Sequence, residues 1–229
     1  MTGAVFFDLD GTLADTAPDL ARALNRVLAE EGRPALPYPR IRAEVSRGGT
    51  ALIRLAFGGT PEDPDFQRRR RRFLDLYAEG LCVETRLFPG IETLLGRLEA
   101  AGLRWGIVTN KPAWLTDPLV RRLGLAGRAA AVVSGDTTDE RKPHPQPLLH
   151  AARVAGADPE ASLYVGDDPR DVQAGRAAGM RTLGALYGYV HPDEDPARWG
   201  ADGLVHAPAE ILKWVLRDGV QAGGRKAFG

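Results

Sequence analysis

The chain shows two different rhythms of hydrophobic and polar residues. Beyond residue 85, short apolar runs that end in polar residues alternate with segments in which apolar residues recur at helical spacing. The apolar runs lie at 103–108, 130–133, 163–165, 181–186 and 203–205, and the helical segments at 91–101, 113–123, 145–155, 169–178 and 207–217. Strands that alternate with helices predict a parallel sheet with helices on both of its faces.

One more apolar run stands at residues 4–7 and ends in an aspartate, whereas residues 18–80 show helical spacing and no strand pattern. We therefore predict an α/β protein with a doubly wound, Rossmann-like core formed by residues 1–15 and 85–229 and an all-helical cap at 16–84. Because the insert leaves the core after the first strand, we expect it above the carboxyl end of that strand. Open α/β sheets bind their ligands at that edge.

The composition is typical of a globular protein without a charge surplus. The 229 residues include 30 Lys+Arg and 30 Asp+Glu, and 44% of them are hydrophobic. A nucleic-acid binder needs a surplus of cations, and a membrane-spanning helix needs about 20 successive apolar residues. We expect a cytoplasmic monomer or weak homodimer, with neither nucleic acid nor membrane as partner. The lone Cys82 excludes an intrachain disulfide, and the Gly-rich, basic tail at 219–229 is expected to fray.

Two carboxylates follow the first strand at a spacing of two residues. Asp8 and Asp10 stand in the segment DLDGTLADT, and because residues i and i+2 of a strand point the same way, both are expected to face one region. Two neighbouring acids at the apex of a buried strand are costly unless a cation lies between them. Gly11 permits a sharp turn there, and Thr12 can stabilise that turn by hydrogen bonds. The alternative is a simple Asp-rich turn between a strand and a helix.

Three later strand ends carry polar residues of complementary kinds. Thr109 offers a hydroxyl group, and Asn110 stands near the start of a predicted helix. Both features favour the binding of an anion. Lys142 precedes a helix whose dipole disfavours a cation, which indicates an anion nearby. A further strand is followed by an acid cluster that consists of Asp167, Asp168 and Asp171. A role as helix N-cap can explain one of these three acids. The histidines lack metal-ligand spacing, so any metal is expected to bind through oxygen, which suits Mg²⁺.

In this order, the four groups of residues resemble the motifs of the haloacid dehalogenase superfamily of phosphotransferases. The matching positions are 8–12, Thr109, Lys142 and 166–171, and the helical insert resembles the family's type 1 cap. The resemblance spans residues 4–206. It implies a phosphoric monoester hydrolase that acts on a small molecule through an aspartyl-phosphate intermediate.

The resemblance also implies a role for each matching residue. Asp8 would attack phosphorus, and Asp10 would protonate the leaving group and then activate water. Lys142 would offset the charge on Asp8, while Thr109 and the amide of Asn110 would hold the phosphoryl oxygens.

Mg²⁺ is the cofactor that the resemblance implies. Its ligands would be the Asp8 carboxylate, the Asp10 main-chain carbonyl and Asp167, while Asp171 and Asp168 would orient its water molecules. Two alternatives stay open at this stage. A phospho-receiver domain also gathers acids, a Thr and a Lys above a parallel sheet, although it is shorter and uses an Asp from a middle strand. Sugar phosphomutases share this core and a similar cap.

The cap contains Arg47, Gly48 and Gly49 between two predicted helices, where the family places its substrate-specificity loop. Paired glycines let the backbone approach a ligand, and Arg47 can bind a substrate carboxylate bidentately. The alternative is a flexible turn with a solvated arginine. The arginine run at 68–72 is expected to be a solvated face of a cap helix, because five successive arginines encircle a helix.

The resemblance leaves two substrates open. The lengths of core and cap agree with phosphoglycolate phosphatases. Several stretches look closer to the bacterial N-acetylmuramic acid 6-phosphate phosphatases of cell-wall recycling, namely 45–49, 110–112, 166–171, 187–192 and 199–202. We therefore expect the muramic acid ester as the preferred substrate and phosphoglycolate as the alternative. Both compounds are carboxylated phosphomonoesters, so a cap arginine fits either.

Overall fold

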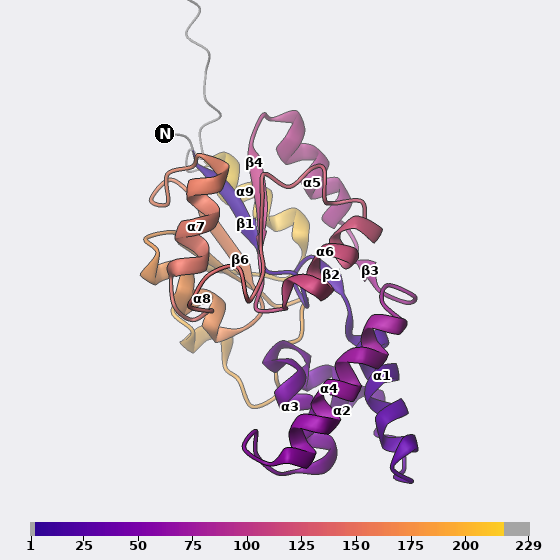
Figure 1. Cartoon of the computed structure of the whole chain (residues 1–229). Coiled ribbons are helices and arrows are strands. Elements are labelled where there is room, and N and C mark those ends of the chain that lie inside the picture. The colour runs from indigo at the N-terminus through magenta and orange to yellow at the C-terminus, as the bar shows by residue number, and fades with distance from the viewer. Residues whose placement is uncertain (1–2, 218–229) are drawn as a thin grey trace, which may run out of the picture.

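The computed structural model describes residues 3–217, which form a sheet with flanking helices and a group of helices at one end of that sheet (Figure 1). The strands are β1 (Ala4–Phe7), β2 (Ala14–Asp15), β3 (Arg86–Leu87), β4 (Arg104–Val108), β5 (Ala131–Val133), β6 (Leu163–Gly166), β7 (Arg181–Ala185) and β8 (Gly203–Val205). The helices are α1 (Ala17–Glu30), α2 (Tyr38–Glu44), α3 (Gly48–Phe57), α4 (Pro64–Glu79), α5 (Ile91–Ala100), α6 (Ala113–Arg122), α7 (Gln146–Ala155), α8 (Pro169–Ala177) and α9 (Pro208–Arg217), with 3-10 helices η1 (Val45–Arg47) and η2 (Pro196–Arg198). The tail at 219–229, which we expected to fray, lies outside the described residues.

Six strands form one parallel sheet in the order β5-β4-β1-β6-β7-β8. β1 lies in its interior, where Phe7 pairs with Ile107 of β4 and with Val165 of β6. The predicted doubly wound α/β class is therefore confirmed, and each strand predicted beyond residue 85 is present to within about two residues. Because the strands run parallel, the carboxyl ends of β4, β1 and β6 lie side by side at one edge.

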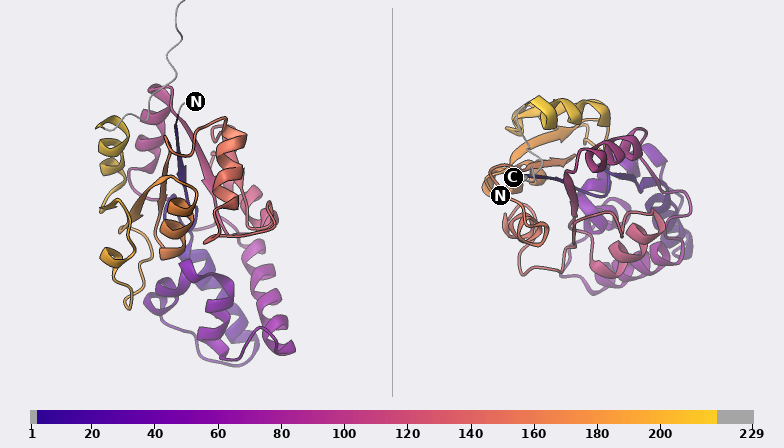
Figure 2. Two further views of the ribbon diagram at one scale, coloured as in Figure 1. Left: turned by 90° about the vertical axis from the view of Figure 1, so that its left-hand side faces the viewer. Right: turned by 90° about the horizontal axis from the view of Figure 1, so that it is seen from above.

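Alternate residues of β1 face two different layers of helices. Val5 and Phe7 belong to a core shared with α5, α6 and α9, whereas Ala4 and Phe6 belong to one shared with α7 and α8. The second view shows helices on both sides of the sheet (Figure 2). All four residues of β1 are fully buried. Burial on both faces explains why the strand is a continuous apolar run in the sequence rather than an alternating pattern.

Helices α1 to α4 occupy the stretch in which we predicted only helices. They pack on one another, α1 and α3 each against α4, and lie beyond the carboxyl ends of the core strands (Figure 1). Two strands that we did not predict, β2 and β3, pair antiparallel where the chain leaves and re-enters the core, with Ala14 opposite Leu87. Strands of two residues are too short to show a hydrophobic period. No helix in the described part of the chain is long and apolar enough to cross a membrane.

A buried carboxylate links the segment in which the chain enters these helices to the segment in which it returns to the core. Asp19, in the first turn of α1, accepts hydrogen bonds from the main-chain N–H groups of residues 83–85, each at 3.0 Å. The Thr85 hydroxyl donates at 2.7 Å, and Arg22 adds an ion pair at 2.8 Å. Burial alone would raise the pKa of Asp19, but these donors and the nearby guanidinium hold the pKa below its usual value.

Replacing Asp19 with Asn should lower the free energy of unfolding by about 2 kcal/mol at neutral pH, because several donors lose a charged acceptor. Since the pKa is lower in the folded than in the unfolded chain, the stabilisation is present above about pH 4 and is lost as the pH falls through the folded-state value. Urea unfolding of the wild type and Asp19→Asn should therefore show a difference that shrinks in acid.

The control is Asp75→Asn, which changes an exposed carboxylate of α4. Its free energy of unfolding should stay within about 0.5 kcal/mol of the wild-type value. An Asp19→Asn protein as stable as the wild type at neutral pH would contradict the role given to Asp19.

Candidate active site

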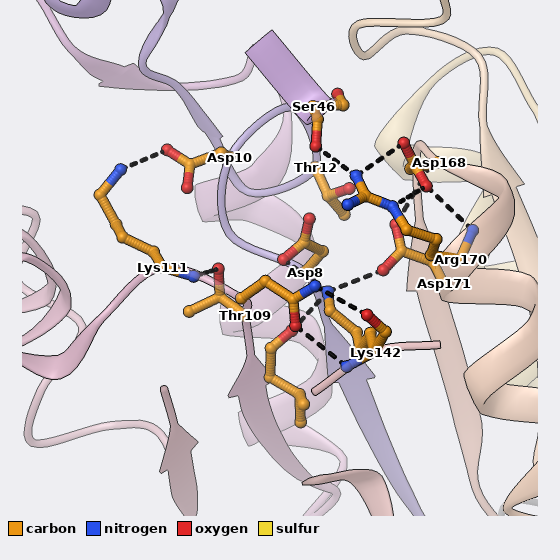
Figure 3. Close-up of polar contacts among 12 residues, drawn as sticks. Asp8, Asp10, Thr12, Ser46, Thr109, Lys111, Lys142, Asp168, Arg170 and Asp171 are labelled. Atoms are coloured by element: carbon orange, nitrogen blue, oxygen red, sulfur yellow. Dashed lines mark hydrogen bonds and ion pairs between the residues drawn. The ribbon is translucent and has the colours of Figure 1, made fainter. Parts of the chain in front are cut away.

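Polar residues that follow β1, β4 and β6 meet at the shared edge of the sheet (Figure 3). Asp8 follows β1, Thr109 follows β4 and Asp167 follows β6. The turn after β1 requires glycine, because Gly11 has a φ of +85° and a Cβ there would lie 2.1 Å from Asp167 Oδ2. The turn that carries Asp8 and Asp10 therefore packs directly against Asp167.

Lys142 is the cation at the centre of the site. Its Nζ lies 2.8 Å from Asp8 Oδ1 and 2.7 Å from Asp171 Oδ1. The same ammonium group donates to the Val108 carbonyl at 3.0 Å and to the Tyr164 hydroxyl at 2.8 Å. Burial opposes the charge of Lys142, but Asp171 and Asp8 raise its pKa above the usual value. The site therefore contains a permanent positive charge in contact with Asp8.

Asn110 holds the backbone of this lysine in place. Its Nδ2 donates to the Lys142 carbonyl at 2.9 Å, and its Oδ1 accepts from the Lys142 N–H at 3.0 Å. The neighbouring Thr109 is 3% exposed, and its hydroxyl oxygen accepts from the main-chain N–H of Lys111 at 3.2 Å. The side-chain amide of Asn110 therefore acts on the protein's own backbone.

Asp8, Asp167 and Asp171 form a cluster in which one carboxylate oxygen of each residue lies within 4.8 Å of the other two. Burial raises the pKa of Asp8 against the opposing effect of Lys142, and burial and the charge of Asp8 raise the pKa of Asp167. Negative charge thus exceeds positive charge among these buried groups. An all-oxygen donor set with surplus negative charge fits Mg²⁺, because a hard divalent cation prefers carboxylate oxygens.

The cluster differs from the ligand set expected from the resemblance. Asp171, expected to act only through water molecules, contributes a carboxylate oxygen to the cluster. Asp168 lies outside the cluster and caps α8, since its Oδ1 accepts from the Arg170 N–H at 2.9 Å. The Arg170 side chain pairs with the same oxygen at 2.7 Å. The N-cap interpretation therefore applies to Asp168.

Asp167 receives hydrogen bonds from the core and from the cap helices. The Thr12 hydroxyl donates to Oδ1 at 2.9 Å, and the Tyr189 N–H donates to Oδ2 at 2.9 Å. The Ser46 hydroxyl of η1 donates to Oδ2 at 2.6 Å, and the Arg170 guanidinium donates to the Ser46 carbonyl. Thr12, which we expected to stabilise its own turn, instead binds Asp167. A cap residue thus touches the acid cluster directly.

Asp10 belongs to a separate pair of charges. It lies with Lys111 on one side of Asp8, while Asp168 lies on the other (Figure 3). Its Oδ1 accepts from Lys111 Nζ at 2.8 Å and from the Thr16 hydroxyl at 2.6 Å. Burial opposes the charge of Lys111, but Asp10 raises the lysine's pKa above the usual value. The carboxylate of Asp10 is therefore oriented by a permanent cation.

The cap segment around Arg47 is helical. Residues 45–47 form η1, and Gly48 and Gly49 begin α3, with Gly48 at a φ of +81°. Arg47, which we expected to bind a substrate carboxylate, pairs with Glu194 at 3.2 Å and with Glu44 at 3.6 Å. Its guanidinium is therefore engaged by the protein's own carboxylates.

A cavity of about 360 Å³ lies between the cap helices and the edge of the sheet. Asp8, Thr109 and Lys142 line it on the core side, together with Asp10 and Asn110. Apolar and aromatic residues of the cap line its other side, namely Val45, Leu52, Phe73, Leu74 and Tyr77. The arrangement suits a ligand with a charged end at the core and a larger body beneath the cap.

Some residues of the site were missed in the sequence. Lys111 directly follows Asn110, and in a chain rich in arginine but poor in lysine this position was a usable signal. Ser46 stands next to Arg47 in a segment that we had selected for its other residues. Tyr164 gave no signal, because a tyrosine within a buried strand is not distinguishable from a core residue.

Comparison with known proteins agrees with this arrangement. A family model described as haloacid dehalogenase-like hydrolase matches residues 5–185. The N-acetylmuramic acid 6-phosphate phosphatase of Pseudomonas aeruginosa is 44% identical over 209 residues, which cover 91% of this chain and 92% of that protein. The phosphoglycolate phosphatase of Xanthomonas campestris is 45% identical over 211 residues, which cover 91% of this chain and 94% of that protein.

A solved structure supports the same relationship. The protein from Haemophilus somnus described as a predicted phosphoglycolate phosphatase matches with a TM-score of 0.82 at 29% identity. The match covers 93% of this chain and 97% of that chain, so it includes both the sheet and the cap helices. Sequence identity does not separate the two activities named among the relatives, because 44% and 45% are equivalent.

Mg²⁺ should raise the unfolding temperature of the wild-type protein, because a cation that binds the folded acid cluster stabilises the folded state. Asp167→Asn should abolish most of this shift in a thermal melt with and without Mg²⁺, since it removes a carboxylate of the cluster.

Asp168→Asn is the matched control, because Asn caps a helix about as well as Asp and residue 168 lies outside the cluster. This variant should keep the shift caused by Mg²⁺. An Asp167→Asn protein that responds to Mg²⁺ as the wild type does would exclude the cluster as the metal site.

Proposed function

This chain belongs to the haloacid dehalogenase-like hydrolase family, and we propose that it is a Mg²⁺-dependent phosphatase that hydrolyses a carboxylated phosphomonoester through an aspartyl-phosphate at Asp8. One observation carries the proposal. Asp8 contacts Lys142 within a cluster of buried acids, at the core side of a cavity large enough for a small molecule.

Asp8 is the proposed nucleophile. A carboxylate that attacks a phosphate dianion meets like-charge repulsion, so cations must be fixed in the site beforehand. Lys142 supplies such a cation at 2.8 Å from Asp8, and Asp171 and Tyr164 hold its ammonium group. In this step an oxygen of Asp8 bonds to phosphorus, and the bond between phosphorus and the leaving oxygen breaks.

Asp8, Asp167 and Asp171 are the proposed carboxylate ligands of Mg²⁺, with the Asp10 main-chain carbonyl as a further ligand. When bound, Mg²⁺ supplies positive charge that offsets the charge of the phosphate. Thr12 and Ser46 orient Asp167 through the hydrogen bonds to its two oxygens.

Asp10 is the proposed general acid and base. It protonates the leaving alkoxide, and it then takes a proton from the water molecule that attacks the aspartyl-phosphate. Lys111 and Thr16 both contact Oδ1 of Asp10, which assigns the proton transfer to Oδ2.

Thr109 and Asn110 are the proposed groups that hold the phosphoryl oxygens. Thr109 lines the cavity together with Lys142. Because the side chain of Asn110 binds the Lys142 backbone, we assign its phosphate contact to the main-chain N–H. Both donors stand at the end of β4, just before the first turn of α6.

We propose N-acetylmuramic acid 6-phosphate as the preferred substrate, with 2-phosphoglycolate as the second candidate. Relatives at 44% and 45% identity bear the names of phosphatases for one or the other compound. The size of the cavity favours the sugar acid, since about 360 Å³ lies within the range of roughly 300–1,000 Å³ that holds drug-sized ligands. A two-carbon acid would leave the apolar cap side of the cavity unfilled.

The value of kcat/KM for the two phosphates, measured with saturating Mg²⁺, tests this preference. We expect the muramic acid ester to be the better substrate by at least tenfold, about 1.4 kcal/mol of transition-state discrimination. The release of inorganic phosphate at the rate of substrate loss separates hydrolysis from a phosphomutase reaction. A tenfold advantage for 2-phosphoglycolate would overturn the preference.

Asp10→Asn should slow the hydrolysis of an alkyl phosphate by about 10²–10⁴-fold, because the leaving alkoxide then lacks a proton donor. p-Nitrophenyl phosphate should be affected much less, because nitrophenolate leaves without protonation. Steady-state rates on the two substrates measure the difference. Equal losses on both would argue against Asp10 as the general acid.

A further inference from the structure

Arg70 lies on the face of α4 that covers the cavity. Helical spacing places it in line with Phe66, Phe73 and Tyr77, all of which are buried. Arg70 itself is half-buried and lines the cavity together with Phe73 and Tyr77. The arginine run, which we expected to be a solvated face, therefore has one member that faces the site.

The other arginines of the run have different surroundings. Arg68 and Arg69 pair with Glu31 at 3.1 and 2.9 Å, and Arg72 pairs with Glu30 at 2.6 Å. Arg71 is exposed. By contrast, the Nε of Arg70 is buried and has no hydrogen-bond partner within the part of the chain that the structure describes.

Most cations that line the cavity are neutralised by a carboxylate of the protein. The pairs, within residues 3–217, are Lys142 with Asp8, Lys111 with Asp10, Arg47 with Glu194 and Arg170 with Asp168. Arg141 also lines the cavity but is exposed to solvent. Arg70 is thus the half-buried cavity cation for which the described residues provide no counter-charge.

A half-buried guanidinium whose Nε is buried without a partner is costly, and an anion bound beside it recovers that cost. Asp8 and Asp171 line the cavity on its core side and Arg70 lines it from the cap helix α4, so an anion bound at Arg70 is a different group of the ligand from a phosphate bound at Asp8. A guanidinium binds a carboxylate through two parallel hydrogen bonds, which gives direction as well as attraction.

We propose that Arg70 binds the carboxylate of the substrate beneath the cap and thereby selects acidic phosphomonoesters. This inference rests on the proposed phosphatase function of the site. It assigns to Arg70 the role that the sequence suggested for Arg47, whose guanidinium is held by Glu194 and Glu44.

The test compares substrates that differ only in the carboxylate. One pair is N-acetylmuramic acid 6-phosphate and N-acetylglucosamine 6-phosphate, which lacks the lactyl acid. The other pair is 2-phosphoglycolate and 2-hydroxyethyl phosphate. p-Nitrophenyl phosphate reports the chemical step with a leaving group that carries no carboxylate.

Arg70→Gln should lower kcat/KM for the better acidic substrate by about 30-fold, mainly through KM, because a charge-assisted hydrogen bond is lost. The value of kcat/KM for the member of the pair without a carboxylate, and for p-nitrophenyl phosphate, should change by less than about threefold. Arg70→Lys keeps the charge but not the planar fork, so its loss of kcat/KM on the acidic substrate should be smaller than that of Arg70→Gln but larger than about threefold.

Arg71→Gln is the matched control, since it removes the same charge from the exposed side of α4. It should leave kcat/KM unchanged for both members of each substrate pair. Circular dichroism and thermal melts establish that the variants are folded, and Arg70→Lys carries the test if Arg70→Gln does not fold.

Three results would overturn the inference: equal losses of kcat/KM for Arg70→Gln on the substrates with and without a carboxylate, no loss on the carboxylated substrate, or the same loss for Arg71→Gln. If the wild type hydrolyses p-nitrophenyl phosphate but does not prefer the acidic member of either pair, the role of Arg70 fails while the phosphatase function stands. If the wild type hydrolyses none of these esters with Mg²⁺, the proposed function itself fails.

Discussion

Three buried carboxylates gather beside the ammonium group of Lys142, which pairs with two of them, and the rest of the site depends on this excess of negative charge. The parallel sheet imposes it, because β1 and β6 end side by side and deliver Asp8 and Asp167 to the same edge. Lys142 offsets only part of the charge. A divalent cation bound there would relieve the remainder, and the same positive charge is what a carboxylate nucleophile needs before it can approach a phosphate. The excess of negative charge therefore underlies both the energetic cost of folding this site and its chemical reactivity.

The cap is linked to this charge cluster by direct contacts. Ser46 donates to Asp167, and Arg170 of α8 donates to the Ser46 carbonyl. Arg42 of α2 donates to the Gly188 carbonyl of the core at 3.1 Å. The cap therefore places an apolar wall over the cavity and, through Ser46, also contacts an acid of the cluster.

The hydrophobic periodicity of the sequence was sufficient to predict the fold. The ion pairs within the site were not predictable from it. The continuous apolar run of β1 and the alternation of strands and helices gave the parallel sheet, and strand ends gave the positions of Asp8, Thr109 and Asp167. Which arginine of the cap lacks a partner depends on Glu31 and Glu194, residues distant in the sequence. No local pattern contains that information, so Arg47 was selected and Arg70 was overlooked.

The most direct test of the central claim is to trap the phosphate on the protein. Enzyme mixed with excess substrate and Mg²⁺ is quenched within a turnover, reduced with borohydride and digested, and the peptides are analysed by mass spectrometry. An acyl phosphate is reduced to an alcohol, so a covalent mechanism predicts homoserine at position 8 and unchanged aspartate at position 10. Full turnover with aspartate intact at position 8, or with homoserine at another position, would contradict the assignment of Asp8 as the nucleophile.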